Sequence, residues 1–152
     1  MKYIFRKAKL PDVEKIHSLV NYYAEKRAML PRALNQIYEN IQGYFVVSCN
    51  KEIVGCCSLS ITWGDIAEIR SLAVLEKLQK KGIGKKLVQL CLEEAKKPEV
   101  KRVFSLTYLP DFFKKMGFKE INKEKLPHKI WTECINCRFF PNCNEVALIK
   151  DI

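Results

Sequence analysis

A lysine-rich loop with two glycines is the feature of this sequence best suited to binding a ligand. It reads Gln79-Lys-Lys-Gly82-Ile-Gly84-Lys85 and lies between an apolar, strand-like segment and a helical one. Glycine removes the Cβ atom that would hold a ligand away from the backbone. The first turn of a helix leaves backbone N–H groups unpaired at the positive end of the helix dipole. The loop therefore predicts a cradle for an anion such as a pyrophosphate.

The same residues allow a plainer interpretation. The glycines would also suit a tightly packed strand–helix connection in which the lysines only add solubility. Two familiar phosphate motifs do not fit the loop. Leu87 stands where a dinucleotide fingerprint needs its third glycine, and no Gly-Lys-Ser/Thr follows as in a P-loop.

The overall charge agrees with an anionic ligand. The 152 residues include 27 Lys and Arg against 17 Asp and Glu, which gives a net charge of +10. The segment from Lys77 to Lys86 contains five lysines and no acid, and it surrounds glycines rather than aromatic stacking residues. This favours a phosphate pocket over a nucleic-acid surface, so no nucleic-acid partner is expected.

The composition is that of a globular protein. Hydrophobic residues make up 48% and charged residues 29%, which excludes a disordered chain. The apolar runs are far shorter than a membrane span, and the run at 3–5 is too short for a signal-peptide core. We expect one cytoplasmic domain over residues 1–152 with no membrane partner, and a homodimer is left open.

The periodicity of apolar residues predicts a mixed α/β order of elements that places the glycine loop between a strand and a helix. The expected strands cover 3–7, 44–49, 53–61, 66–74, 102–107, 118–121 and 145–150. Helices are expected from Pro11-Asp12 onward and over 32–41, 82–96 and 110–116. A Cys-bearing insert at about 122–144 has no clear period.

The pattern Gln79-x-x-Gly82-x-Gly84 after an apolar strand resembles motif A of the GNAT superfamily of N-acetyltransferases. The resemblance implies the GNAT fold, an α/β (α+β) structure with a single mixed, mostly antiparallel sheet flanked by helices. It also implies acetyl-CoA as co-substrate, with no metal needed for catalysis. The residues that it assigns to the pantetheine arm and the phosphates are Leu72, Ala73, Val74, Gln79, Lys80, Lys81, Gly82, Ile83, Gly84 and Lys85.

Several further segments resemble the acetyltransferase domain of N-acetylglutamate synthases. These segments are 67–74, 106–108, 112–118, Leu126-Pro127 and Leu30-Pro31-Arg32. The resemblance implies transfer of an acetyl group to the α-amine of L-glutamate, in arginine biosynthesis. The longer synthases also carry an amino-acid-kinase domain, which the present sequence lacks, so arginine inhibition by that route is not implied.

Three roles follow from this chemistry, each with an alternative. Glu68 is the candidate base that deprotonates the amine, or else it only pairs with Arg70. Tyr108 is the candidate acid for the leaving thiolate, since Phe113 occupies the place where many GNAT enzymes carry a tyrosine. The alternative for Tyr108 is an aromatic wall. Arg32 and Arg70 are the candidate partners of two substrate carboxylates, or else solvated surface charges.

Three cysteines form a separate cluster, Cys134-x-x-Cys137-x5-Cys143. Structural zinc needs four ligands, so a metal site would require His128 or a partner subunit as well. A reversible disulfide and three reduced thiols are the alternatives. Two other functions also remain open: acetylation of a protein or peptide amine, and a non-catalytic acyl-CoA-binding module that regulates a partner.

Overall fold

The computed structural model describes residues 2–26, 29, 31–126 and 145–152, and in them one seven-stranded sheet has the order β1-β2-β3-β4-β5-β7-β6. Only the β4–β5 pair is parallel, so the sheet is mixed and mostly antiparallel as expected. The strands are β1 Tyr3–Lys7, β2 Tyr44–Cys49, β3 Glu52–Trp63, β4 Ile66–Val74, β5 Arg102–Thr107, β6 Lys119–Glu120 and β7 Val146–Asp151.

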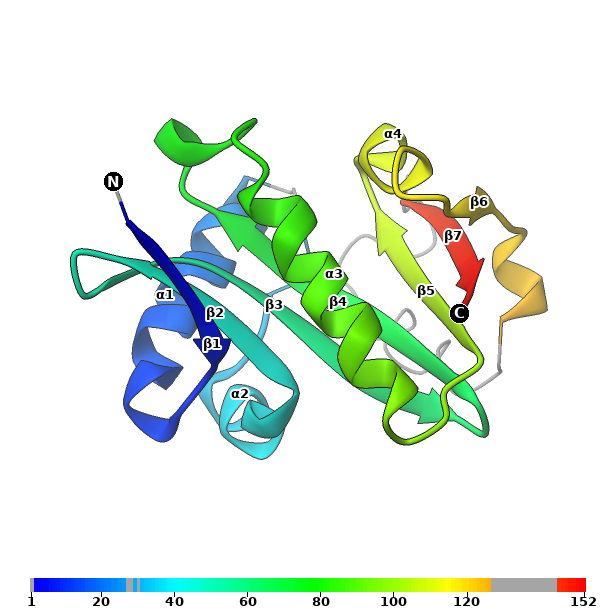
Figure 1. Cartoon of the computed structure of the whole chain (residues 1–152), viewed down its shortest axis with the longest axis horizontal. Coiled ribbons are helices and arrows are strands. Elements are labelled where there is room, and N and C mark those ends of the chain that lie inside the picture. Colours follow the sequence, from blue (N-terminus) through cyan, green and yellow to red (C-terminus); the bar gives the residue numbers. More distant parts are fainter. Residues whose placement is uncertain (1, 27–28, 30, 127–144) are drawn as a thin grey trace.

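Helices cover both faces of this sheet. They are α1 Val13–Glu25, α2 Leu34–Glu39, α3 Ile83–Lys96 and α4 Pro110–Lys114, and short 3-10 turns lie at Leu10–Asp12, Ile41–Gly43, Glu76–Leu78 and Lys123–Lys125. Figure 1 shows α3 crossing the sheet on one side, with α1 and α2 on the other. Candidate site residues lie on both of these sides.

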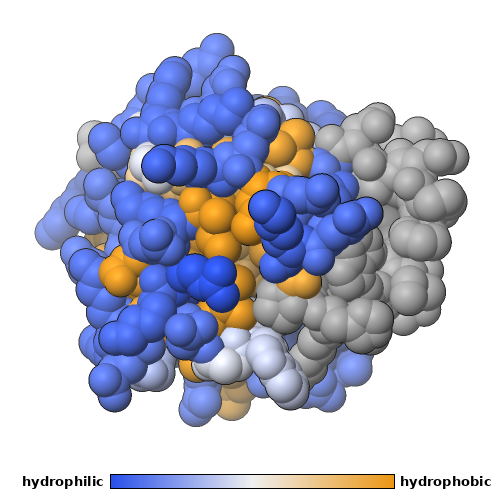
Figure 2. Space-filling view, turned by 90° about the vertical axis from the view of Figure 1, so that its right-hand side faces the viewer, coloured by the Kyte–Doolittle hydropathy of each residue, from blue (hydrophilic) through white to orange (hydrophobic). Residues whose placement is uncertain are grey.

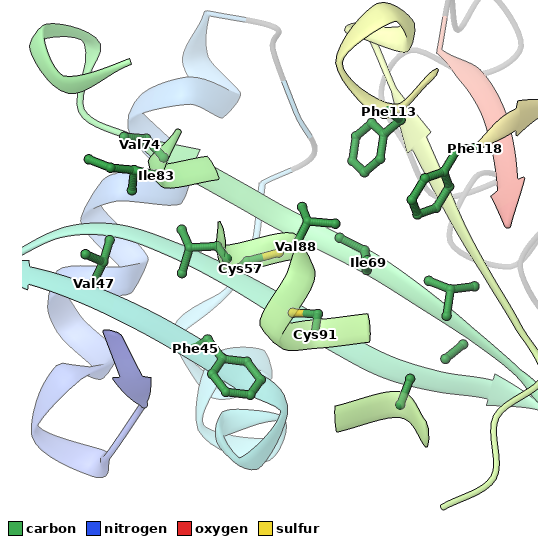
Figure 3. Packing of buried hydrophobic residues seen from close by; sticks show 14 of the residues in the cluster. Phe45, Val47, Cys57, Ile69, Val74, Ile83, Val88, Cys91, Phe113 and Phe118 are labelled. Carbon is green, nitrogen blue, oxygen red and sulfur yellow. The ribbon is translucent and has the colours of Figure 1, made fainter. Parts of the chain in front are cut away.

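The core under α3 is made of side chains that the sequence periodicity places on one face. Val88 and Cys91 of α3 are fully buried against Val47, Cys57 and Ile69 of the strands (Figure 3). On the opposite side, α1 buries the apolar stripe that its sequence predicts, from Val13 to Tyr23. Burial on both faces holds β4, the strand that carries the candidate site residues, at the centre of the sheet.

Three expected elements are at least two residues shorter than the sequence indicated, and one of them, the helix expected over 110–116, ends as α4 at Lys114. The helix expected over 32–41 is only α2, and it is followed by a 3-10 turn, because its apolar stripe does not stay buried: Ile37 is fully buried while Leu34 is 38% exposed. The strand expected over 118–121 is reduced to β6. Gly117, with a φ of 92°, reverses the chain just before that strand.

The surface mixes hydrophilic residues with scattered hydrophobic ones. Figure 2 views the side of the molecule where α4, β6 and β7 lie in Figure 1, and it shows hydrophobic residues reaching the surface between hydrophilic ones. Leu10, Trp63 and Leu109 are the most exposed large hydrophobic residues described, and each lies at the start or end of an element. None of the helices described is long and apolar enough to cross a membrane.

Candidate active site

The candidate site begins where β4 and β5 separate. The two strands pair only through residues 66–68 and 102–104, and Figure 1 shows them diverging beyond that point. The hydroxyl of Ser105 then donates a 3.0 Å hydrogen bond to the carbonyl of Ile69, where the ladder stops. From residue 70 to Val74, the edge of β4 that faces β5 pairs with no other strand in the described part of the chain.

An irregularity in β4 lies at the same level as this opening. Cys56 pairs with Ala73 and Ser58 pairs with Arg70, so two residues of β4, Ser71 and Leu72, lie opposite one residue of β3. Ser71 has a φ of 57°, as expected of a bulge. The Cys56 thiol donates to the Ser71 carbonyl at 3.3 Å. The bulge therefore changes the alternation of side chains between Arg70 and the end of β4.

The glycine loop has the geometry that the sequence predicted. In the described structure, the backbone N–H groups of residues 80–85 have no hydrogen-bond acceptor. Gly82 has a φ of 84°, and a Cβ atom built on it would meet nothing within 4 Å. A Cβ on Gly84 would lie 3.6 Å from the ring of Phe112 and 4.0 Å from Leu72. The loop thus combines unpaired donors, an open space beside Gly82 and an apolar wall.

The side chain of Gln79 is hydrogen-bonded within the protein. Its side-chain amide nitrogen donates to the Val74 carbonyl at 3.0 Å and to the hydroxyl of Tyr23 at 3.1 Å. These bonds fasten the start of the loop to the end of β4. Contact between Gln79 and a phosphate remains a prediction, and the amide nitrogen is already occupied within the protein.

The other half of the site is a polar cluster on the α1 and α2 side of the sheet. Tyr44 pairs with Ser58, Ser58 pairs with Arg70, and Ser60 pairs with Glu68, so these residues share one face. Glu68 is only 7% exposed, and its carboxylate lies 3.6 Å from the Arg70 guanidinium. Arg70 also donates to the Ser60 hydroxyl at 3.1 Å. The ion pair that the sequence gave as the alternative role of Glu68 is therefore present.

Arg32 is held in the vicinity of the same cluster. Its backbone N–H donates to the Asn21 side chain at 3.2 Å, and its carbonyl accepts from that side chain at 2.9 Å. Burial raises the pKa of Tyr44, while its hydrogen bond with Ser71 and the charges of Arg32 and Arg70 act in the opposite direction. Both guanidinium groups are thus close enough to Tyr44 to act on its hydroxyl.

The remaining predicted residues fall around these two halves. Ala73 packs in the core under α1, whereas Leu72 and Val74 pack on the α3 side. Tyr108 directly follows β5 and is half-buried. Phe113 is 3% exposed, and its ring packs edge-on against Phe118 at 5.2 Å. Phe113 is a core residue, so the place where many GNAT enzymes carry a tyrosine holds no acid here.

Sequence reasoning missed four residues of the polar cluster: Tyr44, Ser58, Ser60 and Ser71. Ser58 has a fully buried hydroxyl without a hydrogen-bond partner in the described structure. The hydroxyl of Tyr44 donates to that of Ser71 at 3.4 Å. The sequence contained one signal: serines two residues apart in an apolar strand, at 58 and 60, must share a face.

The cysteine cluster of the sequence cannot be placed, because Cys134, Cys137 and Cys143 lie outside the described residues. Elsewhere in the chain, the described residues contain no group of three or more His, Cys, Asp or Glu arranged to hold a metal ion. Cys49, Cys56, Cys57 and Cys91 are buried free thiols, as the apolar runs around them predicted. Burial raises the pKa of Cys56 to about 12, so this thiol stays protonated at neutral pH.

Comparison with known proteins identifies relatives along almost the whole chain. An uncharacterised N-acetyltransferase of Chlorobaculum tepidum is 41% identical over 147 residues, covering 97% of this chain and 95% of that protein. An amino-acid acetyltransferase of Mycobacterium tuberculosis is 34% identical over 140 residues, covering 90% of this chain and 79% of that protein.

Solved structures share the same fold. A Mycobacterium tuberculosis protein in complex with CoA has a TM-score of 0.84 at 28% identity, covering 98% of this chain and 99% of that one. An N-acetylglutamate synthase from Neisseria gonorrhoeae, complexed with coenzyme A and N-acetyl-glutamate, has a TM-score of 0.88 at 22% identity. It covers 99% of this chain but only 35% of that one, and at this identity the likeness concerns the fold alone.

The family assignment rests on the sequence as well as on the fold. The sequence pattern of the acetyltransferase (GNAT) family matches residues 10–118, which include the β4 strand, the glycine loop and α3. The expected GNAT fold is confirmed by this match together with the solved structures. The chain therefore belongs to the acetyltransferase (GNAT) family.

Proposed function

We propose that this protein is an amino-acid N-acetyltransferase that acts in the cytoplasm on the α-amine of L-glutamate, for arginine biosynthesis. Acetyl transfer from acetyl-CoA follows from family membership. The 34% identical relative named amino-acid acetyltransferase supports an amino-acid acceptor. The observation that carries the proposal is the Glu68–Arg70 pair at the point where β4 and β5 separate, with Arg32 acting on the neighbouring Tyr44.

The glycine loop and the open edge of β4 fit acetyl-CoA. The unpaired N–H groups of residues 80–85 and the space beside Gly82 suit a pyrophosphate, and nearby lysines add positive charge. Backbone groups of residues 72–74 line the unpaired edge of β4, where they suit the amides of a pantetheine arm. When bound, acetyl-CoA supplies the thioester that carries the acetyl group.

Glu68 is the residue best placed to act as general base. The α-amine of an amino acid is protonated at neutral pH and must lose a proton before it can attack a thioester. Glu68 lies at the end of the β4–β5 ladder, close to the open edge. Its carboxylate would accept this proton directly or through one water molecule.

The two arginines give the acceptor site its charge preference. L-Glutamate carries two carboxylates, and a guanidinium group can hold a carboxylate through two parallel hydrogen bonds. The side chain of Arg70 is 18% exposed and lies beside Glu68, which would place a bound carboxylate and the amine next to the base. Arg32, whose charge also acts on Tyr44, would hold the second carboxylate.

Tyr108 is the proposed donor of a proton to the leaving thiolate. It lies directly after β5, the strand that separates from β4 at the opening. Departure of the thiolate needs less help from a protein side chain than deprotonation of the amine does. A thiol has a pKa of about 8.5 and leaves readily as a thiolate. Loss of the Tyr108 hydroxyl should therefore reduce turnover less than loss of Glu68.

The proposal is tested by steady-state kinetics of CoA release with four acceptors: glutamate, glutamine, aspartate and a short lysine peptide. A charge-assisted hydrogen bond contributes about 1.5–3 kcal/mol, so glutamate should exceed glutamine in kcat/KM by about tenfold to a hundredfold. A higher value for the peptide would instead identify a protein-amine acetyltransferase. No turnover with any acceptor, together with tight binding of acetyl-CoA, would indicate a non-catalytic module.

A further inference from the structure

The last two turns of α1 contact both halves of the site. On the donor side, the hydroxyl of Tyr23 donates to the carbonyl of Val74, the last residue of β4, and accepts a 3.1 Å hydrogen bond from Gln79. On the acceptor side, Asn21 exchanges two hydrogen bonds with the backbone of Arg32. One helix thus touches the strand end, the start of the glycine loop and the segment that carries an acceptor-site arginine.

We propose that Tyr23 is a positioning residue for acetyl-CoA: its buried hydroxyl fixes the first residue of the glycine loop to the end of β4. The inference rests on the proposed function, because it concerns the loop to which that function assigns the pyrophosphate. Tyr23 makes no contact with the loop's N–H groups of residues 80–85, so it acts through Gln79 and Val74.

The three groups form a closed ring of three hydrogen bonds. Tyr23 is 8% exposed, and burial raises the pKa of its hydroxyl, which therefore keeps its proton for donation. The Gln79 amide nitrogen uses one hydrogen for Tyr23 and one for Val74, at 3.1 Å and 3.0 Å. Tyr23 and Val74 are buried whereas Gln79 is exposed, so the buried hydroxyl and carbonyl set the position at which the Gln79 amide binds. The five-residue step from Val74 to Gln79 is thereby held at both ends.

A second set of contacts from the same turn is exposed and provides a comparison. The hydroxyl of Tyr22 donates to the Glu76 carboxylate at 3.1 Å, and Lys26 forms an ion pair with that carboxylate at 2.8 Å. Exposed pairs of this kind contribute little to stability. Tyr22 therefore offers a matched control, because it is one residue away, touches the same connection and loses the same atom on substitution by phenylalanine.

The positioning role predicts which kinetic constant changes. A loop that is less well ordered loses binding energy equally in the ground state and the transition state, which raises KM and leaves kcat unchanged. The Tyr23 hydroxyl makes two hydrogen bonds, and removal of each changes an equilibrium by about two- to tenfold. Tyr23→Phe should therefore weaken CoA binding and raise KM for acetyl-CoA by about that factor, with KM for the acceptor unchanged.

Calorimetric titration with CoA, on wild type, Tyr23→Phe and Tyr22→Phe, tests the inference at a temperature where thermal melting shows all three folded. Weaker binding by Tyr23→Phe alone is the expected result. Equal affinity in all three proteins, or equal weakening in both variants, would overturn the inference. Failure of the wild type to bind CoA would overturn the proposed function itself.

A second variant approaches the same network from the loop. Gln79→Met removes the partner amide and should weaken CoA binding by a similar factor. In the double variant Tyr23→Phe/Gln79→Met the two losses should be less than additive, because both break one network. Fully additive losses would show that Tyr23 and Gln79 act independently and would contradict the inference. If Tyr23→Phe folds poorly, the Gln79→Met single variant alone still tests the network, and CoA affinity equal to that of wild type would contradict the inference.

Discussion

Glu68 is both buried and paired with an arginine, unlike an ordinary surface glutamate. It is 7% exposed, and it lies 3.6 Å from the only arginine with which the described structure pairs it. A carboxylate in that setting serves either as part of an ion pair or as a proton acceptor that the ion pair holds in place. The two roles differ in what happens when the charge is removed and the shape is kept.

Glu68→Gln should lower kcat by about 10²–10⁴, the range for loss of a general base, while CoA still binds. The amide retains the shape of the side chain but cannot accept the proton. Turnover should be measured between pH 6 and 9, with Glu52→Gln, an exposed glutamate of β3, as the control. Wild-type turnover across this range would leave Glu68 with a structural role only.

Arg70 holds two partners at once, the Glu68 carboxylate and the Ser60 hydroxyl, through different nitrogens of its guanidinium. Lysine keeps the charge but cannot reproduce this planar fork. Arg70→Lys should raise KM for glutamate by about tenfold or more and leave KM for acetyl-CoA unchanged. Arg102→Lys, at an exposed position of β5, serves as the control. Equal KM values for glutamate in both variants would place the acceptor carboxylate elsewhere.

At the level of elements, the sequence predicted the strands well where turn residues bound them. The strands at 44–49 and 66–74 have the bounds that alternation and flanking glycine or asparagine residues indicated, and those at 3–7 and 102–107 have the bounds that alternation alone indicated. The helix at α2 was overestimated because a stripe of three apolar residues carries no information about where burial stops. The glycine loop was predictable because the residues that give it its chemistry are consecutive in the sequence.

The acceptor half was less predictable because it depends on strand register. Tyr44, Ser58 and Arg70 come from three strands and meet only because these strands pair in one register. The bulge at Ser71 shifts that register by one residue, and no residue type in 66–74 indicates that a bulge is present. The hydrogen bond between Gln79 and Tyr23 likewise joins residues that are far apart in sequence. The sequence therefore offered single residues as candidates, whose roles remain predictions, and it missed their neighbours.

The start of α1 depends on one buried carboxylate. Asp12 accepts two hydrogen bonds from the Arg6 guanidinium, at 2.7 Å and 3.0 Å, and a third from the backbone N–H of Lys9 at 2.8 Å. The hydrogen bonds from Arg6 are the main reason that the pKa of Asp12 is lowered. These bonds fix the connection between β1 and the helix that carries Asn21 and Tyr23.

Asp12→Asn should lower the free energy of unfolding by about 1.5–3 kcal/mol at pH 7, the range for hydrogen bonds to a charged group. Because the folded pKa is lowered, this contribution is complete above the unfolded value of about 3.9 and is lost as the pH falls through the folded pKa. Urea unfolding of both proteins from pH 3 to 7 should show the difference shrinking below about pH 4. A difference independent of pH would contradict the ionic origin of the effect.

Considered as a whole, the molecule places the residues proposed for donor binding and those proposed for acceptor binding on opposite sides of one strand. Leu72 and Val74 belong to the side covered by α3, whereas Glu68 and Arg70 belong to the side covered by α1 and α2. The bulge at Ser71 lies between the two sets. A reaction between groups on the two sides is feasible only at an unpaired edge of that strand, and the separation of β5 from β4 provides such an edge.

A ligand that binds across this edge should stabilise the entire fold. At a CoA concentration 100 times its Kd, binding adds about 2.7 kcal/mol to the free energy of unfolding. For a domain of this length, each kcal/mol raises Tm by about 2–4 °C, so CoA should raise Tm by about 5–10 °C. Thermal melting with and without CoA measures this shift directly, and it needs no knowledge of the acceptor.

The same measurement shows whether the stabilisation comes from the glycine loop. Gly82 and Gly64 both have positive φ values, and a Cβ on either would meet nothing within 4 Å, so valine strains the backbone at both positions. Gly82→Val would place its side chain in the space assigned to the pyrophosphate, whereas Gly64→Val changes only the β3–β4 turn. Both variants should melt below wild type, but CoA should raise Tm in Gly64→Val and not in Gly82→Val. An equal CoA-induced shift in the two variants would show that the phosphates bind away from this loop.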